Sequence, residues 1–247
     1  MRKQKKRKSK LKIILIIVFL LLTLNCIRNN RKSIEIFFNN ISNSSVYKVV
    51  KQDLNNNYSG VGQKKVSDKD GYFTTFTTTD NKKFIEYKQN GNSPWCNNSY
   101  WGGTMEENGC GITSMAIILS GYDKAYTPEY LRKKYYPKLN YDTLSKELEN
   151  TFEIENSDFY YDSIHCSEKS ISEHLKTGRP ILVCVWDNGL KNRWTEKSHY
   201  IVLLATDGNG MVYVSNPNGG KNDSKSSGWY DFDEIIPYIA KAMYIES

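Results

Sequence analysis

The sequence predicts an α+β domain in which a helical first part is followed by an antiparallel sheet. Two observations carry this prediction. Apolar residues recur at helical spacing between residues 109 and 176, and from residue 180 they gather into short runs typical of strands. A Gly-containing turn, Asp207–Gly210, separates two of these runs. We therefore expect helices and strands to be segregated along the chain.

Three helices are expected in the first part. Gly109–Gly121 places Ile112, Ala116 and Leu119 on one face, with Gly121 suited to the C-terminal cap. The second helix begins at Thr127 as N-cap, with Pro128 at its first position. The third covers Ser167–Lys176, and a fourth, later helix is expected over Asp231–Ile239.

The strands follow residue 180. Cys184 lies inside an apolar run and is expected to be a buried core residue rather than a reactive one. The expected strands are Pro180–Trp186, Tyr200–Ala205, Met211–Ser215 and a closing strand at Ala242–Ile245.

Charge excludes nucleic acid as a partner. The formal net charge is +7, but eleven of the 34 Lys and Arg residues lie in residues 1–32, which hold no acid. The remaining chain has 23 basic residues against 27 acidic ones. A phosphate-binding domain needs its positive charge on the folded part, which is here mildly acidic.

The N-terminus predicts export. A basic cytoplasmic segment (residues 1–10) runs into an apolar segment (residues 11–27), which is typical of a signal anchor or signal peptide. An uncleaved anchor, a cleaved signal and a lipoprotein cysteine at Cys26 stay open, and all three place the rest of the chain outside the cell. The expected location is the cell membrane, with secretion after cleavage as the alternative.

A polar spacer is expected over residues 28–83, followed by one folded domain over 84–247. The segment Gly71–Thr79 fits a propeptide, a linker or an extra strand equally well. The cysteines show no paired spacing for a metal site and are too few for a disulfide framework, so neither a metal nor a cofactor is expected.

Cys110 is the candidate nucleophile. It lies between Gly109 and Gly111 at the start of an apolar helix, where the helix dipole favours negative charge and lowers a thiol pKa. The flanking glycines allow a substrate carbonyl to approach closely. A structural cysteine between two turn glycines is the alternative at this position.

His199 is the candidate base. It opens an expected strand after the polar loop Asp187–Ser198, and Asn216 ends the next strand, about one strand length away. A side-chain oxygen at Asn216 would fix the tautomer of the imidazole. Asn216-Pro217 also fits an ordinary turn, and His165 and His174 fit solvated side chains.

Together these segments resemble the papain-like cysteine peptidases, most closely the relatives of the bacteriocin-leader-processing peptidases (peptidase family thirty-nine). The resemblance rests on Gly109–Gly121, on His199–Leu203 with the turn after it, and on Val214–Pro217. Lys88–Trp95 and Trp101–Gly103 also look like this group, and the resemblance covers roughly residues 84–247.

The resemblance implies a papain-like fold, with the nucleophile on a helix in the first part and the base on the sheet. It implies Cys110 as nucleophile, His199 as general base and acid, Asn216 as the orienting residue and Gln89 as an oxyanion donor. The substrate would be a peptide or protein. Two other functions stay open: a cell-wall peptide amidase or transpeptidase that uses the same thiol, and a non-catalytic binding module on the same scaffold.

Overall fold

The computed structural model describes residues 64–67, 72–122, 126–140, 144–190, 194–219 and 225–246. The basic segment, the expected membrane anchor and the lipoprotein candidate Cys26 lie outside the described residues, as does most of the expected spacer. Within the described part of the chain, no helix is long and apolar enough to cross a membrane.

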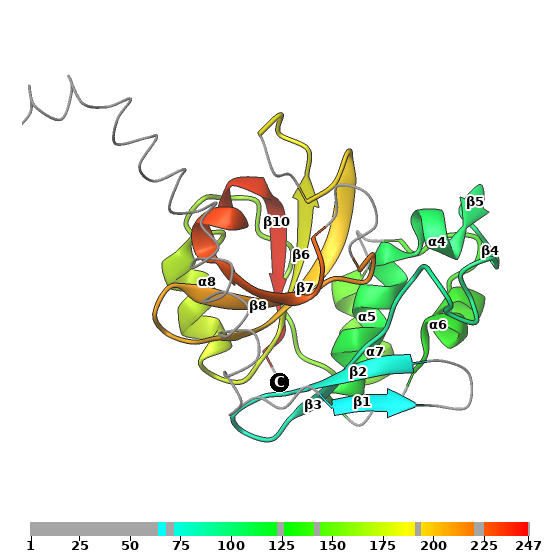
Figure 1. Ribbon diagram of the computed structural model, residues 1–247, viewed down its shortest axis with the longest axis horizontal. Helices are drawn as coiled ribbons and strands as arrows, with labels where there is room; N and C mark the ends of the chain where they lie inside the picture. Colours follow the sequence, from blue (N-terminus) through cyan, green and yellow to red (C-terminus); the bar gives the residue numbers. More distant parts are fainter. Residues whose placement is uncertain are drawn as a thin grey trace, which may run out of the picture. The chain divides into compact units, whose positions relative to one another are not determined.

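A five-stranded antiparallel sheet forms the centre of the fold, with strand order β10-β6-β7-β8-β9 (Figure 1). The expected antiparallel sheet is therefore present. At the turn between β7 and β8, Asp207 Oδ1 accepts hydrogen bonds of 2.8 Å from both the Asn209 and the Met211 backbone N–H. The strands are β6 (Ile181–Trp186), β7 (Ser198–Thr206), β8 (Met211–Ser215), β9 (Gly228–Asp231) and β10 (Ile239–Tyr244).

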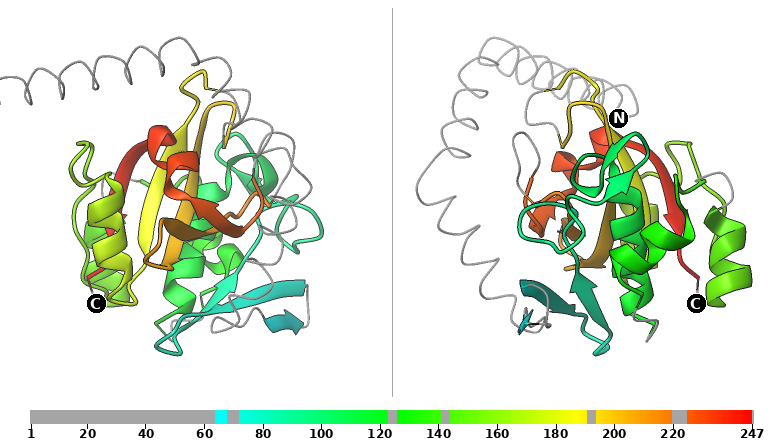
Figure 2. Two further views of the ribbon diagram at one scale, coloured as in Figure 1. Left: turned by 60° about the vertical axis from the view of Figure 1, so that its left-hand side comes forward. Right: turned by 90° about the vertical axis from the view of Figure 1, so that its right-hand side faces the viewer.

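Both faces of this sheet are covered, because successive residues of β6 and β7 point to opposite sides. Leu182 and Tyr200 belong to the cluster around α5 (Cys110–Ser120), whereas Val183 and Ile201 pack with α8 (Glu168–Leu175). The two helices accordingly lie on opposite faces of the sheet (Figure 2). Cys184 is a buried core residue, as the sequence predicts.

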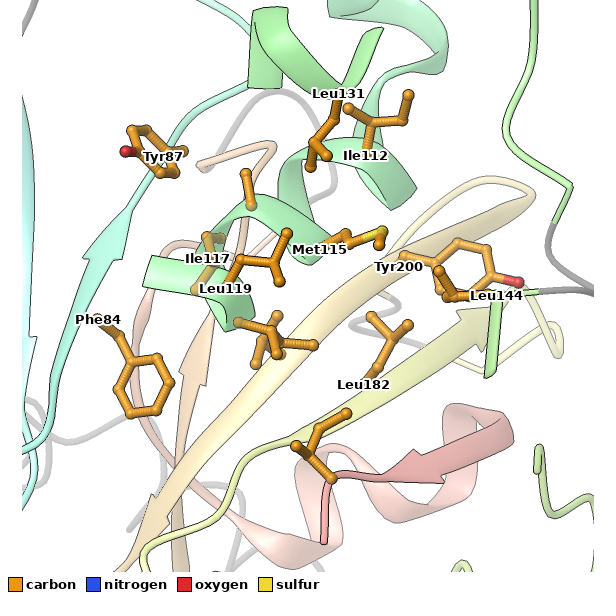
Figure 3. Packing of buried hydrophobic residues seen from close by; sticks show 14 of the residues in the cluster. Phe84, Tyr87, Ile112, Met115, Ile117, Leu119, Leu131, Leu144, Leu182 and Tyr200 are labelled. Atoms are coloured by element: carbon orange, nitrogen blue, oxygen red, sulfur yellow. The ribbon is translucent and has the colours of Figure 1, made fainter. Parts of the chain in front are cut away.

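The helix α5 is buried on all sides rather than along one stripe, since every residue from Gly111 to Leu119 is buried (Figure 3). Its other side packs against β3, and Gly121 lies so close to Phe84 that an added Cβ would stand 2.1 Å from the ring. Ser114 Oγ donates to the carbonyl of Tyr200 at 3.1 Å and ties the helix to β7.

The predicted helix starts are confirmed. Thr127 Oγ1 accepts from the Tyr130 backbone N–H at 3.2 Å, and Ser167 Oγ accepts from Ser170 at 3.3 Å. Two helices were not predicted from the sequence: α4 (Met105–Asn108) and α7 (Leu144–Phe152). The other elements of this region are α6 (Pro128–Lys134), β4 (Ser99–Tyr100) and β5 (Gly103–Thr104).

The packed fold begins before residue 84, because β1 (Lys64–Ser67) pairs with β2 (Tyr72–Thr77), and β2 pairs with β3 (Lys83–Glu86). Most of Gly71–Thr79, part of the expected spacer, is therefore a strand. Phe73 stacks on Trp95 with ring centroids 5.4 Å apart, and Phe76 stacks on Tyr213 at 3.9 Å. These aromatic side chains anchor β2 to the core, so the expected start at Phe84 falls inside β3.

The expected helix over Asp231–Ile239 is wrong. Asp231 ends β9 and pairs with Met211, and two short 3-10 helices follow, η2 (Phe232–Glu234) and η3 (Ile236–Tyr238). Pro237 has no N–H to donate, so a continuous α-helical ladder cannot form across it. The closing strand β10 starts earlier than predicted, at Ile239.

Candidate active site

Strands β7 and β8 bring His199 and Asn216 together. His199 is the second residue of β7 and pairs with Val185 of β6, while Asn216 directly follows β8. The ring Nε2 of His199 lies 2.8 Å from Asn216 Oδ1. Both residues are buried, at 5% and 0% exposure, so water does not compete for this hydrogen bond.

The surroundings of Asn216 fix which atom faces the ring. Asn216 Oδ1 also accepts from the Asn218 backbone N–H at 2.9 Å, and Asn216 Nδ2 donates to the carbonyl of Lys225. The atom beside His199 is therefore an acceptor, and Nε2 must carry a proton. In the neutral imidazole this leaves Nδ1 as the basic nitrogen.

Cys110 reaches the same strand from the start of α5. The backbone N–H groups of Tyr200 and Gly111 lie near its thiol and act to lower the thiol pKa. Because Tyr200 directly follows His199 in β7, the sulfur lies at the end of the strand that carries the imidazole. Cys110 is partly exposed, in contrast to the other described cysteines, which are buried and likewise free.

The electrostatics differ from the sequence-based expectation. Burial raises the pKa of the Cys110 thiol, and the backbone N–H groups at the helix start offset this only in part. Burial also lowers the pKa of His199 to about 4, against the opposing effect of its Asn216 hydrogen bond, and the charge of Lys88 lowers it further. Near neutral pH, both groups are therefore neutral at rest.

Gln89 is folded back to the site although it lies 21 residues before Cys110. Its backbone N–H donates to the Pro217 carbonyl at 2.9 Å, and its side-chain Nε2 donates to the Glu106 carbonyl at 2.7 Å. Its Oε1 is buried and has no hydrogen-bond partner among the described residues. Gln89 thus connects Pro217, through its backbone, with the segment that leads into Cys110, through its side chain. Its oxyanion role stays a prediction.

Residues 88–90 lie beside residues 216–218, with residue 88 next to residue 216 and residue 90 next to residue 218. Lys88 Nζ donates to the Asn216 carbonyl at 2.7 Å, and Asn90 Nδ2 donates to Asn218 Oδ1 at 2.7 Å. Sequence reasoning missed the part played by Lys88. Phe84 and Glu86 share the buried face of β3, and Lys88 lies two positions after Glu86. This spacing was the signal in the sequence that Lys88 could be buried.

The comparison with protein families is decisive at this point. The family model described as the Peptidase_C39 like family matches residues 81–236, which is more than half of the chain. The chain belongs to this family. The matched range contains all four predicted site residues of this C39-like cysteine peptidase.

Other comparisons add little to this assignment. A crystal structure of a protein from Bacillus anthracis assigned to the C39-like peptidases is similar at 13% identity, covering 57% of this chain and 90% of that one. Its TM-score to this chain is 0.40. No curated protein sequence matches the chain.

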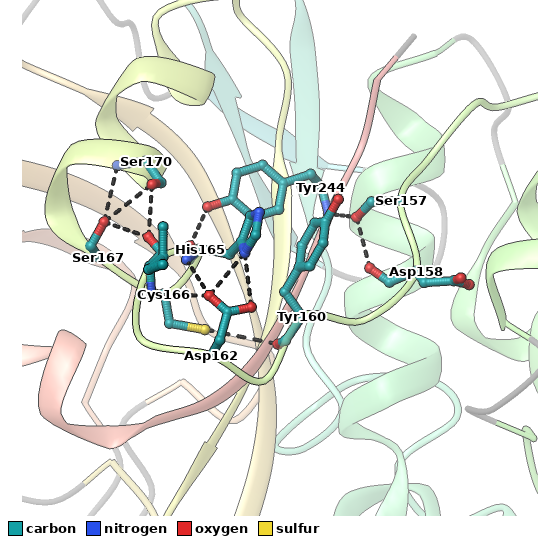
Figure 4. Close-up of polar contacts among 10 residues, drawn as sticks. Ser157, Asp158, Tyr160, Asp162, His165, Cys166, Ser167, Ser170 and Tyr244 are labelled. Carbon is teal, nitrogen blue, oxygen red and sulfur yellow. Dashed lines mark hydrogen bonds and ion pairs between the residues drawn. The ribbon is translucent and has the colours of Figure 1, made fainter.

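The remaining histidines of the C39-like domain lie elsewhere. His165 Nδ1 is 2.8 Å from Asp162 Oδ2, and its ring stacks on Tyr160 with centroids 3.8 Å apart (Figure 4). The neighbouring Cys166 thiol donates to the Tyr160 carbonyl at 3.8 Å instead of facing an imidazole base. Among the described residues, no group of three His, Cys, Asp or Glu side chains could hold a metal ion.

Five aromatic residues that precede Cys110 or His199 in the sequence divide into two sets by their exposure. Trp186 and Trp101 are about half exposed, whereas Trp95, Tyr100 and Trp194 are buried core residues. Trp194 also fixes the end of the loop Asp187–Ser198, because its Nε1 donates to the Glu234 carbonyl at 2.7 Å. This anchor holds the segment that immediately precedes β7.

Proposed function

We propose that the chain is a membrane-anchored cysteine peptidase that acts outside the cell and hydrolyses peptide bonds with Cys110, His199 and Asn216. The observation that carries the proposal is the buried hydrogen bond between His199 Nε2–H and Asn216 Oδ1, which leaves Nδ1 as the base. A third group that fixes the tautomer of a histidine is the arrangement that thiol and serine hydrolases use.

The reaction begins from a neutral pair. His199 Nδ1 takes the thiol proton while Cys110 Sγ attacks the substrate carbonyl, so the sulfur becomes nucleophilic without a resting thiolate. The oxyanion accepts hydrogen bonds from the Cys110 backbone N–H and the Gln89 amide. The imidazolium then protonates the leaving amine, and the neutral ring takes a proton from the water that releases the acyl group.

Asn216 makes no charge contribution to this cycle. It is neutral, so the imidazolium that forms is held by geometry rather than by an ion pair. Because His199 is protonated only while a tetrahedral intermediate carries negative charge, the two charges appear and vanish together. This suits a site in which burial disfavours either charge alone.

The proposals of a membrane anchor and of a substrate outside the cell are based on the sequence. The basic residues 1–10 and the apolar residues 11–27 support a single span with the catalytic domain outside, where a peptide, a protein or a cell-wall peptide is available. Protease digestion of intact cells should remove the domain if it lies outside. Digestion only after lysis would contradict this orientation.

The activity test compares the full chain with Cys110→Ser, and uses Cys166→Ser as the matched control. We expect cleavage of unstructured peptides by the unaltered chain and by Cys166→Ser, and none by Cys110→Ser, with products identified by mass spectrometry. Release of fragments from purified wall material alone would favour the amidase. Inactivity on both substrates would favour the binding module and contradict the proposal.

A further inference from the structure

A buried polar network surrounds the backbone of Asn216. Its centre is Lys88, whose Nζ donates to the Asn216 carbonyl at 2.7 Å and to Ser227 Oγ at 2.8 Å. Ser227 Oγ in turn accepts from the Asn216 backbone N–H at 2.9 Å. The lengths of both bonds from Lys88 fit charge-assisted hydrogen bonds.

These contacts fix the backbone on both sides of Asn216. The peptide group between residues 216 and 217 has no N–H, because residue 217 is proline, so its carbonyl is the polar atom by which it can be held. Lys88 holds that carbonyl, and Ser227 holds the N–H of the preceding peptide group. Together they set the direction in which the Asn216 side chain leaves the backbone.

The backbone of Lys88 is itself held in place by hydrogen bonds. Its own backbone carbonyl accepts from Trp95 Nε1 at 2.7 Å and from Ser93 Oγ at 2.8 Å. Glu86, two residues earlier, is 1% exposed and accepts from the Tyr213 hydroxyl at 3.2 Å. Lys88 therefore combines a charge interaction with the buried carboxyl group of Glu86 and a hydrogen bond to the backbone of Asn216.

We propose that Lys88 is a positioning residue of the active site: it aligns Asn216 with the imidazole, and its positive charge disfavours the protonated form of His199. This rests on the proposed function, in which His199 accepts the thiol proton. The hydrogen bonds of the Lys88 ammonium group go to Asn216 and Ser227, so Lys88 acts through Asn216 and His199.

The direction of the charge effect follows from the groups around the ring. The charge of Lys88 disfavours the imidazolium, and the neighbours on β6 and α5, Cys184 and Cys110, are neutral thiols whose pKa values are raised by burial. Burial lowers the pKa of Lys88 and the charge of Glu86 raises it, while burial raises the pKa of the Glu86 carboxyl. Removal of the Lys88 charge should therefore make His199 easier to protonate.

The test is a proton titration of His199 by NMR in the full chain with labelled histidine. The chain has three histidines, so His199→Ala identifies the signal, and His165 is the internal control. In Lys88→Met the midpoint of His199 should rise by about one pH unit, as expected for the loss of one nearby charge. Lys88→Arg keeps the charge and should stay near the unaltered value.

A purely structural role would lower the melting temperature of Lys88→Met without moving this midpoint, and that result would overturn the proposal. An equal shift in Lys88→Arg would do the same. If Lys88→Met fails to fold, Lys88→Gln, which keeps a donor without the charge, must show the upward shift. In peptide cleavage, Lys88→Met should lower kcat at an unchanged KM, since Lys88 does not touch substrate.

The two hypotheses fail in different ways. If no variant or parent cleaves peptides, the proposed function is wrong, yet the midpoint of His199 still reports on Lys88. If the parent cleaves peptides and Lys88→Met leaves both the midpoint and kcat unchanged, the peptidase stands and the role of Lys88 is wrong.

Discussion

Replacement of Asn216 by aspartate tests the orientation of its side chain, on which the tautomer of His199 depends. The change keeps the shape of the side chain but turns the donor Nδ2 into an acceptor oxygen. That oxygen would face the Lys225 carbonyl, to which Nδ2 now donates. The substitution therefore removes one buried hydrogen bond and places two acceptors against each other.

The expected cost follows from these contacts. A buried acceptor left without its donor costs about 1–3 kcal/mol, and the burial of a carboxylate at a position of 0% exposure adds to this. Asn216→Asp should therefore lower the free energy of unfolding by about 2 kcal/mol or more at pH 7, even though it offers His199 a negative charge. Urea denaturation of both chains measures the difference.

Asn218→Asp is the matched control two residues away. Asn218 is partly exposed and presents Oδ1 to Asn90 Nδ2, so water and a donor can accommodate a carboxylate there. We expect a smaller change in stability for this variant. If Asn216→Asp is as stable as the unaltered chain, the Nδ2 contact is absent, and the assignment of Nδ1 as the base is refuted.

Three further predictions concern the same site. The pKa of His199 is about 4 in the folded protein against an ordinary value of 6.5. Between these two pH values the unfolded chain binds more protons than the folded one. The free energy of unfolding should therefore fall as the pH drops from 6.5 to 4, by up to about 3 kcal/mol. This dependence should flatten in His199→Ala, and an unchanged slope in urea unfolding would contradict the burial of a neutral ring. Trp194→Phe leaves the Glu234 carbonyl without its donor and should cost about 1–3 kcal/mol, whereas the half-exposed Trp186→Phe should change unfolding little; equal effects would refute the anchor. Gln89→Ala should lower kcat for peptide cleavage about 10²-fold without a comparable change in KM, and full activity would remove it from the oxyanion site.

The parts of the fold that depend on local pattern were predictable. The caps at Thr127 and Ser167 and the strand Met211–Ser215 follow from residues next to one another in the sequence. The failures come from long-range packing. Phe73 and Phe76 looked like isolated aromatic residues in a polar segment, and only their contacts with Trp95 and Tyr213 show that β2 belongs to the core.

The candidate site divides in the same way. Cys110, His199 and Asn216 could be singled out because their residue types and places along the expected elements suit one chemistry. The charge state of the pair could not be predicted, because it depends on burial and on Lys88, which reaches Asn216 across 128 residues of sequence. The helix start favours a thiolate, but burial has the larger effect on the pKa of Cys110.

The most direct test of the central claim, that Cys110 and His199 act as one pair, is the alkylation rate of Cys110 with iodoacetamide across pH, with the modified residue mapped by mass spectrometry. In a coupled pair, the small fraction in which the proton has moved from sulfur to Nδ1 does not depend on pH between the two apparent pKa values. We therefore predict that the alkylation rate of the unaltered chain stays constant between about pH 5 and 8. In His199→Ala the rate should fall about tenfold for each pH unit by which the pH is lowered. Superimposable rate profiles of the two chains would contradict the account.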